Sequence, residues 1–204
     1  ACWDILGQYL KVPIYQLLGG KVRDKIKVYA NGWYSGERSP ENFAKKAKFL
    51  SSKGYQALKF DPFGSEHLRL DKESENFIKK IIRSVRDSVG PDVELMIEGH
   101  KRFNVFEAIK IAKWLDEFDV TWFEDPIDNN DIDSLIYVSQ NSPVRIIAGE
   151  GFDKYKDFTR FASSNATDIV NPEVIKIGGI GGAIKVANIC SSFDVDLAFH
   201  NAES

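Results

Sequence analysis

What this sequence lacks already excludes several classes of protein. Its 204 residues include only two cysteines, so a disulfide framework is excluded and a reducing, cytoplasmic location is expected. No run of about 18 apolar residues occurs, so we expect no membrane span and no membrane partner. The 27 Lys and Arg residues are outnumbered by 30 Asp and Glu residues, which argues against a nucleic-acid partner. With 43% apolar residues, the chain has the composition of an ordinary globular protein.

Short apolar runs alternate along the chain with amphipathic segments of helical length. Seven runs predict β-strands, at residues 27–30, 57–60, 94–97, 121–123, 145–148, 168–170 and 196–199. Strands that alternate with helices indicate βα units and a parallel sheet. Polar residues follow nearly every strand, at the edge where (β/α)8 barrels build their active sites. The first strand is followed by no glycine-rich phosphate loop, so we favour a (β/α)8-type TIM barrel over an open doubly wound sheet.

Helix-capping residues support this alternation. Ser39 predicts the start of one helix, and Asp71 predicts the start of a second helix that Gly90 ends. Asn104 predicts the start of a third helix. Residues 1–18 are also expected to form a helix, and no linker interrupts the strands and helices that follow it.

Three glutamates recur at one spacing. Glu98, Glu124 and Glu150 lie 26 residues apart, and each ends an expected strand. One βα unit returns the chain to the same edge of the sheet, so the three carboxylates are expected to converge. Like charges so close repel unless a cation or protons lie between them, and a hard divalent cation, most simply Mg²⁺, takes oxygen ligands. The alternative is that some of these glutamates are solvated or ion-paired surface charges.

Side-chain alternation along the strands adds candidates beside this site. Residues i and i+2 of a strand face the same way, so His100 is expected to accompany Glu98, and Asp61 to accompany Lys59. An inward lysine beside three carboxylates can bind an anionic substrate or stabilise developing charge. The alternative for Lys59 is a structural ion pair with one of the carboxylates.

A histidine and a glutamate are also expected to meet near the end of the chain. His200 ends the last expected strand, 27 residues after Glu173, which itself lies two residues beyond Asn171. A carboxylate beside a histidine fixes its tautomer and raises its basicity, which suits a general base. The alternative for His200 is a hydrogen-bonded polar residue without a catalytic role. The remaining histidine, His67, falls in a polar loop and is given no role.

The run Gly178-Gly179-Ile180-Gly181-Gly182 opens an expected helix. A phosphate-binding helix N-terminus is one interpretation, but the run lacks both the Walker lysine spacing and the GxGxxG pattern. Close packing of the helix is the preferred interpretation of these glycines.

Several stretches together resemble the enolase superfamily, in its mandelate racemase branch. They lie at residues 3–7, 17–20, 59–64, 97–104, 124–126, 149–150, 171–173, 177–179 and 199–202. The likeness spans essentially the whole chain. Within the branch the chain is most similar to archaeal sugar-acid dehydratases that act on gluconate and galactonate, a likeness carried by residues 28–34 and 59–64.

The resemblance implies Mg²⁺-dependent dehydration of a small-molecule sugar acid to a 2-keto-3-deoxy acid. Three residues match the metal ligands of the family: Glu98, Glu124 and Glu150. His200, oriented by Glu173, matches the base that removes the C2 proton, and His100 matches the acid that protonates the departing 3-hydroxyl. Four residues at strand ends are expected to line the substrate site: Asn31, Lys59, Asp61 and Asn171.

The resemblance also implies a domain organisation. Residues 1–20 are expected to be a remnant helix that joins a missing N-terminal capping domain to the barrel, and residues 21–204 a partial barrel that lacks its last βα unit. A homo-oligomer is expected for the full-length protein. Asp61 stands where racemising members carry a lysine, which favours dehydration. A racemase or cycloisomerase of the same superfamily and a non-catalytic fragment stay open as alternatives.

Overall fold

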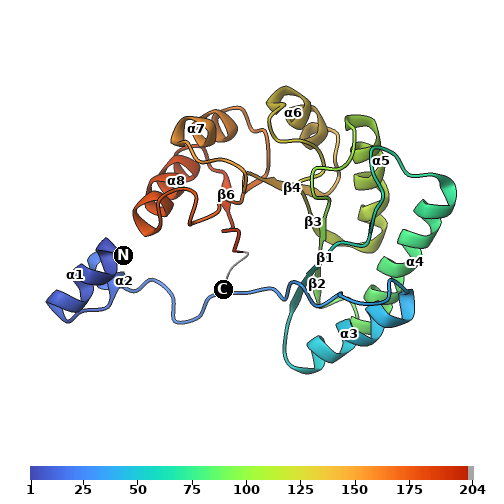
Figure 1. Ribbon diagram of the computed structural model, residues 1–204, viewed down its shortest axis with the longest axis horizontal. Helices are drawn as coiled ribbons and strands as arrows, with labels where there is room; N and C mark the ends of the chain where they lie inside the picture. The colour runs from blue at the N-terminus through green and yellow to red at the C-terminus, as the bar shows by residue number, and fades with distance from the viewer. Residues whose placement is uncertain (202–204) are drawn as a thin grey trace.

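Six parallel strands form one sheet in the computed structural model, which describes residues 1–201 (Figure 1). The strands are β1 (Ala57–Phe60), β2 (Glu94–Glu98), β3 (Val120–Glu124), β4 (Arg145–Ala148), β5 (Ile169–Val170) and β6 (Asp196–Leu197). Each strand pairs with the next one along the chain. This order, with a helix after nearly every strand, confirms the expected incomplete (β/α)8-type barrel. The last three residues of the expected barrel domain, 202–204, lie outside the described residues.

Most of the helices lie on the outer side of the sheet (Figure 1). The helices are α1 (Cys2–Leu10), α2 (Ile14–Leu17), α3 (Pro40–Ser52), α4 (Lys72–Val89), α5 (Val105–Leu115), η1 (Asp116–Phe118), α6 (Ile132–Gln140), α7 (Tyr155–Ser163) and α8 (Ile180–Ser192). Helices α3 to α8 form an arc around the strands, and α1 and α2 lie beyond the α8 end of that arc (Figure 1). Within residues 1–201, none of the helices is long and apolar enough to cross a membrane.

The predicted caps are confirmed. The side chains of Ser39, Asp71 and Asn104 accept hydrogen bonds from backbone N–H groups in the first turns of α3, α4 and α5, at 3.3, 2.8 and 2.9 Å. Gly90 ends α4 as expected. These contacts satisfy N–H groups that have no partner within the helix, so they fix where each helix begins relative to the strand before it.

The two faces of the sheet have different compositions. Leu58, Leu95 and Phe123 point outward and join the main core beneath the helices. Met96 and Trp122 point inward and join a smaller cluster. Because side chains alternate along a strand, Glu98 and Glu124, two residues further along β2 and β3, also face inward, past the end of that smaller cluster.

Two expected elements differ in the structure. Residues 27–30 do not form a strand, because only Ala30 pairs with β1, in one parallel bridge to Leu58. The side chains of Val22 and Ile26 before it are 87% and 73% exposed, so this segment is not packed into the sheet. The single helix expected over residues 1–18 is divided into α1 and α2, because Pro13 lacks the N–H that would continue a helix.

The glycine-rich run packs α8 closely against the loop before it. A Cβ atom on Gly182 would lie 1.8 Å from the carbonyl oxygen of Ile177, a distance that no side chain tolerates. A Cβ atom on Gly181 would lie 3.5 Å from Trp3 Nε1, an ordinary contact. This geometry supports close packing of α8 as the reason why residue 182 is a glycine.

We expect Gly182→Ala to lower the free energy of unfolding by about 2 kcal/mol or more, because the added methyl group displaces backbone. Gly181→Ala is the matched control one residue away, and it should leave the stability unchanged or raise it by up to about 1 kcal/mol, since alanine favours a helix. Equilibrium urea denaturation of both variants measures the difference. Equal stabilities would contradict this account of α8.

Candidate functional site

The ends of β2, β3 and β4 bring three glutamates to one edge of the sheet. Glu98 and Glu124 are partners in the β2–β3 register, and Glu150 follows β4 by two residues. Glu98 and Glu124 are 5% and 1% exposed, whereas Glu150 is half-buried. The predicted convergence of the strand ends is therefore observed, and at least two of the carboxylates are buried where a negative charge needs compensation.

Lys59 supplies that compensation for Glu98 and Glu124. Its Nζ atom lies 3.1 Å from Glu98 Oε2 and 2.7 Å from Glu124 Oε2, and its side chain is only 3% exposed. Burial alone would lower the pKa of Lys59, but the two carboxylates outweigh it and raise the pKa above its usual range. Burial raises the pKa of Glu124 above its usual range, and the Glu98 charge adds to this effect. Lys59 is thus a buried counter-ion shared by two glutamates.

Glu150 is paired with two other cations. Lys101 Nζ lies 2.9 Å from Glu150 Oε1, and His200 Nε2 lies 2.9 Å from Glu150 Oε2. Lys101 also lies 3.2 Å from the buried carboxylate of Asp125. The His200 hydrogen bond and Lys101 together hold the pKa of Glu150 well below its usual range. Both oxygens of Glu150 therefore have positively charged or hydrogen-bonding neighbours.

His200 also meets Glu173, as the sequence predicted. Its Nδ1 atom lies 2.7 Å from Glu173 Oε2, and a single parallel bridge joins the backbones of the two residues. The hydrogen bonds to Glu150 and Glu173 raise the pKa of His200 to about 9. Both carboxylates therefore favour the protonated form of the imidazole, with Glu173 as the partner of Nδ1.

A second histidine–carboxylate pair lies at the other end of the sheet. His100 Nδ1 lies 2.8 Å from Asp61 Oδ2, and Arg102 also donates to that oxygen. The hydrogen bond to Asp61 raises the pKa of His100. Both residues lie just beyond their strands, where strand alternation no longer applies, and His100 adopts a left-handed backbone with φ 50°.

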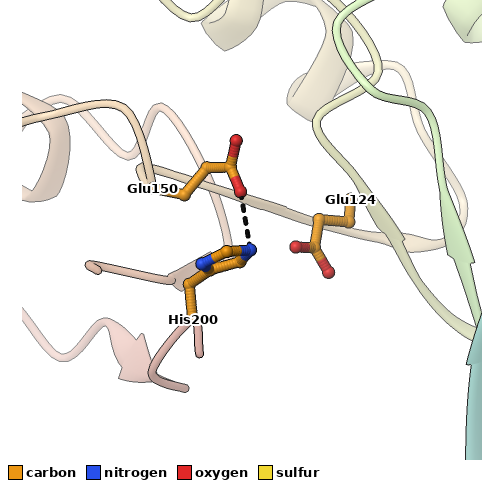
Figure 2. A group of neighbouring side chains, drawn as sticks. All are labelled: Glu124, Glu150 and His200. Carbon is orange, nitrogen blue, oxygen red and sulfur yellow. Dashed lines mark ion pairs between the residues drawn. The ribbon is translucent and has the colours of Figure 1, made fainter. Parts of the chain in front are cut away.

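Glu124, Glu150 and His200 form a group that could hold a metal ion (Figure 2). One ligand atom from each lies within 4.8 Å of the others. Among residues 1–201, buried Glu124 Oε2 accepts no hydrogen bond of good geometry, although Lys59 Nζ is close to it. The two carboxylates of this group suit a hard divalent cation such as Mg²⁺, as predicted, whereas the imidazole nitrogen is not a ligand that Mg²⁺ prefers. Glu98, the third predicted ligand, is linked to this group through Lys59.

The other predicted site residues lie in different surroundings. Asn171 is buried at the end of β5 and donates a hydrogen bond to Glu124 Oε1 at 2.9 Å, so it contacts the candidate metal group. Asn31 is exposed, one residue beyond the bridge at Ala30. Its side chain is not part of the paired charges described above.

Sequence reasoning missed Lys101 and Asp125 as members of the site. Asp125 is 2% exposed, and Asn129 donates to its carboxylate at 2.7 Å. An aspartate directly after Glu124 would face away from it in a regular strand, but Asp125 has φ 42°, which turns the chain out of the strand. The signal available in the sequence was the proline of Glu-Asp-Pro. Because proline ends strand pairing, it indicates that the aspartate before it lies where the chain leaves the strand.

Comparison with known proteins agrees with this geometry. Residues 42–204 match the family described as Enolase C-terminal domain-like. The D-gluconate dehydratase of Thermoproteus tenax is 40% identical over 99% of this chain and 41% of its own length. The D-gluconate/D-galactonate dehydratase of Picrophilus torridus is 38% identical over 99% of this chain and 52% of its own length.

A solved structure is also similar. The 3,6-anhydro-D-galactonate cycloisomerase from Zobellia galactanivorans is 31% identical, with a TM-score of 0.87 over 99% of this chain and 54% of that one. The chain thus spans about half the length of the relatives it matches. The resemblance to the enolase superfamily is confirmed, and the chain belongs to the Enolase C-terminal domain-like family.

Proposed function

We propose that this chain carries the active site of a Mg²⁺-dependent sugar-acid dehydratase, a hydro-lyase that acts on gluconate- or galactonate-type substrates. One observation carries the proposal. Two histidine–carboxylate pairs, His100–Asp61 and His200–Glu173, lie after strands at opposite ends of the sheet. The three glutamates lie at the ends of β2 and β3 and just after β4. A site with one proton-transfer group on each side of a carboxylate cluster suits removal of a proton and loss of a hydroxyl from neighbouring carbons.

The metal ligands in this proposal are Glu98, Glu124 and Glu150. Their support is the oxygen donor set, the buried oxygen of Glu124 and the gathering of Glu124 and Glu150 with His200. Bound there, Mg²⁺ would supply positive charge close to a substrate carboxylate, which favours the negative charge that develops when the adjacent C2 proton leaves. Asn171 orients Glu124 through its hydrogen bond to Oε1.

The chain's own residues carry the protons. Glu173 holds a proton on Nδ1 of His200, which leaves Nε2 to accept the C2 proton once Glu150 is no longer bonded to that atom. His100 delivers a proton to the 3-hydroxyl, which leaves C3 as water. Tautomerisation of the resulting enol gives the 2-keto-3-deoxy acid, so the balance is one sugar acid to one keto acid and one water.

The names of the relatives support this substrate class, since two of them are dehydratases of gluconate or galactonate. A cycloisomerase is the second candidate, because the similar solved structure carries that name. Such an enzyme would use the same proton abstraction at C2 without net loss of water.

The division into a linking segment, residues 1–20, and a barrel from residue 21 belongs to the same proposal. So does a homo-oligomeric, cytoplasmic full-length protein.

The first test is a screen of aldonic acids. We expect the full-length protein with Mg²⁺ to convert D-gluconate or D-galactonate to a 2-keto-3-deoxy acid, measured by a colorimetric assay for that product. Proton NMR in deuterium oxide separates the second candidate, because a racemase or cycloisomerase exchanges the C2 proton without elimination. A protein that forms no product from any aldonic acid would remove the dehydratase assignment.

Glu124→Gln tests the metal ligands. A concentration of Mg²⁺ about 100 times its Kd should raise the free energy of unfolding of the unaltered protein by about 2.7 kcal/mol. We expect this stabilisation, and metal-dependent activity, to be lost in the variant, because an amide is a poorer ligand than a carboxylate. Glu94→Gln, at the opposite end of β2, is the control and should retain both. Metal stabilisation that survives in Glu124→Gln would remove this residue from the ligand set.

His200→Asn tests the base. The variant should lose exchange of the C2 proton with solvent deuterium, because no other group replaces its Nε2 atom. Its Mg²⁺ affinity, measured by isothermal titration calorimetry, should not weaken, because His200 is bonded to Glu150 Oε2 and competes for it. His67→Asn, at an exposed position, is the control. Exchange at the normal rate in His200→Asn would exclude His200 as the base.

A further inference from the structure

We propose that Asp61 is the positioning residue for His100, which it holds through Nδ1 so that Nε2 is the atom available for proton transfer. The role of His100 as the general acid rests on the proposed dehydration, whereas its positioning by Asp61 does not. The sequence placed Asp61 among the substrate-binding residues, and the contacts described next assign it to this different task.

Both carboxylate oxygens of Asp61 are already used within the protein. Oδ1 accepts a hydrogen bond from the backbone N–H of Phe63 at 2.8 Å. Oδ2 lies 2.8 Å from His100 Nδ1 and also accepts from the guanidinium of Arg102. The Asp61 side chain is only 11% exposed, so little of it is open to a substrate. Because an ionised carboxylate only accepts, Nδ1 of His100 must carry the hydrogen in this bond.

Arg102 holds Asp61 in place from the neighbouring segment. Its Nε atom donates to Gly99 O at 3.1 Å, a second nitrogen donates to Gly64 O, and its guanidinium lies 5.7 Å from the centre of the Phe63 ring. Arg102 therefore bridges the loop after β1 and the turn after β2. Asp61 is held by this bridge and by the Phe63 amide, which makes it a rigid partner for the imidazole.

The backbone of His100 is fixed as firmly as its ring. Its N–H donates to Glu98 Oε1 at 2.8 Å, and the next residue, Lys101, donates its N–H to Asp125 O at 2.6 Å. Two successive non-glycine residues adopt left-handed conformations, with φ 50° at His100 and φ 60° at Lys101. Strain of this kind persists only where several contacts hold it, and it concentrates at functional sites.

His100 is nevertheless open to solvent at its other side. Its side chain is 55% exposed, although its Nδ1 atom and its backbone are held. A ring held by one nitrogen and accessible elsewhere is what proton exchange with a ligand requires. His200 is bonded to Glu173 through Nδ1 as well, so the two histidines share one arrangement at opposite ends of the sheet.

The first measurement is the tautomer of His100, by ¹⁵N-histidine NMR of the metal-free protein. This chain contributes three histidines, and the variants His67→Gln and His200→Asn identify the signals of the other two. In its neutral form, His100 should show a protonated Nδ1 and an unprotonated Nε2. A protonated Nε2 with a bare Nδ1 would overturn the proposal, whatever activity the protein has.

Asp61→Asn is the second measurement. The amide is the same size, but its NH₂ group can donate to Nδ1, so the neutral His100 should change to the Nε2-protonated tautomer. Glu173→Gln is the matched control, because it should change the signals of His200 and leave those of His100 unaltered. Signals of His100 that are identical with and without Asp61 would contradict the positioning role.

Kinetics of Asp61→Asn then connect the tautomer to the reaction. With the sugar acid found in the screen, kcat should fall by about 100-fold, the lower end of what a general acid contributes, while KM changes little. A residue that bound substrate would mainly raise KM, and that result would overturn the proposal. If no sugar acid is dehydrated, the dehydratase assignment fails, and the tautomer of His100 still decides the role of Asp61.

Discussion

Buried negative charge at the ends of adjacent strands is the constraint on which the rest of this structure depends. Glu98 and Glu124 have almost no contact with solvent, and each carboxylate would be costly there without a neighbouring cation. Lys59 reaches both of them from β1, the strand next to β2. Because these three charged side chains face inward, the apolar residues next to them in the strands, Leu58, Ile97 and Phe123, point outward to the helices. The charge balance of the site and the two-sided composition of the sheet are therefore one arrangement.

The order of the strands decides where the proposed proton-transfer groups lie. In a sheet that follows chain order, residues after β1 and β2 are at one end, and residues after β5 and β6 are at the other. Asp61 with His100, and Glu173 with His200, are consequently separated by Glu124 at the end of β3 and Glu150 just after β4. A substrate placed over these carboxylates would have one histidine on each side. This separation arises from the parallel topology and needs no special loop.

Sequence reasoning located the strand ends well and their side-chain partners less well. The constant spacing of the glutamates was informative because each βα unit returns to the same edge, and the pairing of Glu173 with His200 followed from the same rule. His100 and Asp61 were expected from strand alternation, yet they meet through turns in which that alternation has ended. Lys101 could not be placed at all, since its left-handed backbone and its bond to Glu150 depend on tertiary contacts. The strand expected at 27–30 is absent for a similar reason. A strand forms only where it pairs with a neighbouring strand, and the β-propensity of a segment does not show whether it does so.

Glu150 links the proposed metal ligands to the proposed base. Its Oε1 atom is bonded to Lys101 and its Oε2 atom to His200 Nε2, so this histidine shares an oxygen with the cation that Glu150 would bind. While that bond exists, it favours the protonated imidazole, which cannot accept a proton. Glu173 contacts the other ring nitrogen, Nδ1, so both nitrogens of His200 have a carboxylate partner. The proposed ligand set and the proposed base are therefore joined through one carboxylate, Glu150, which contacts His200 Nε2 and lies in the same group as Glu124.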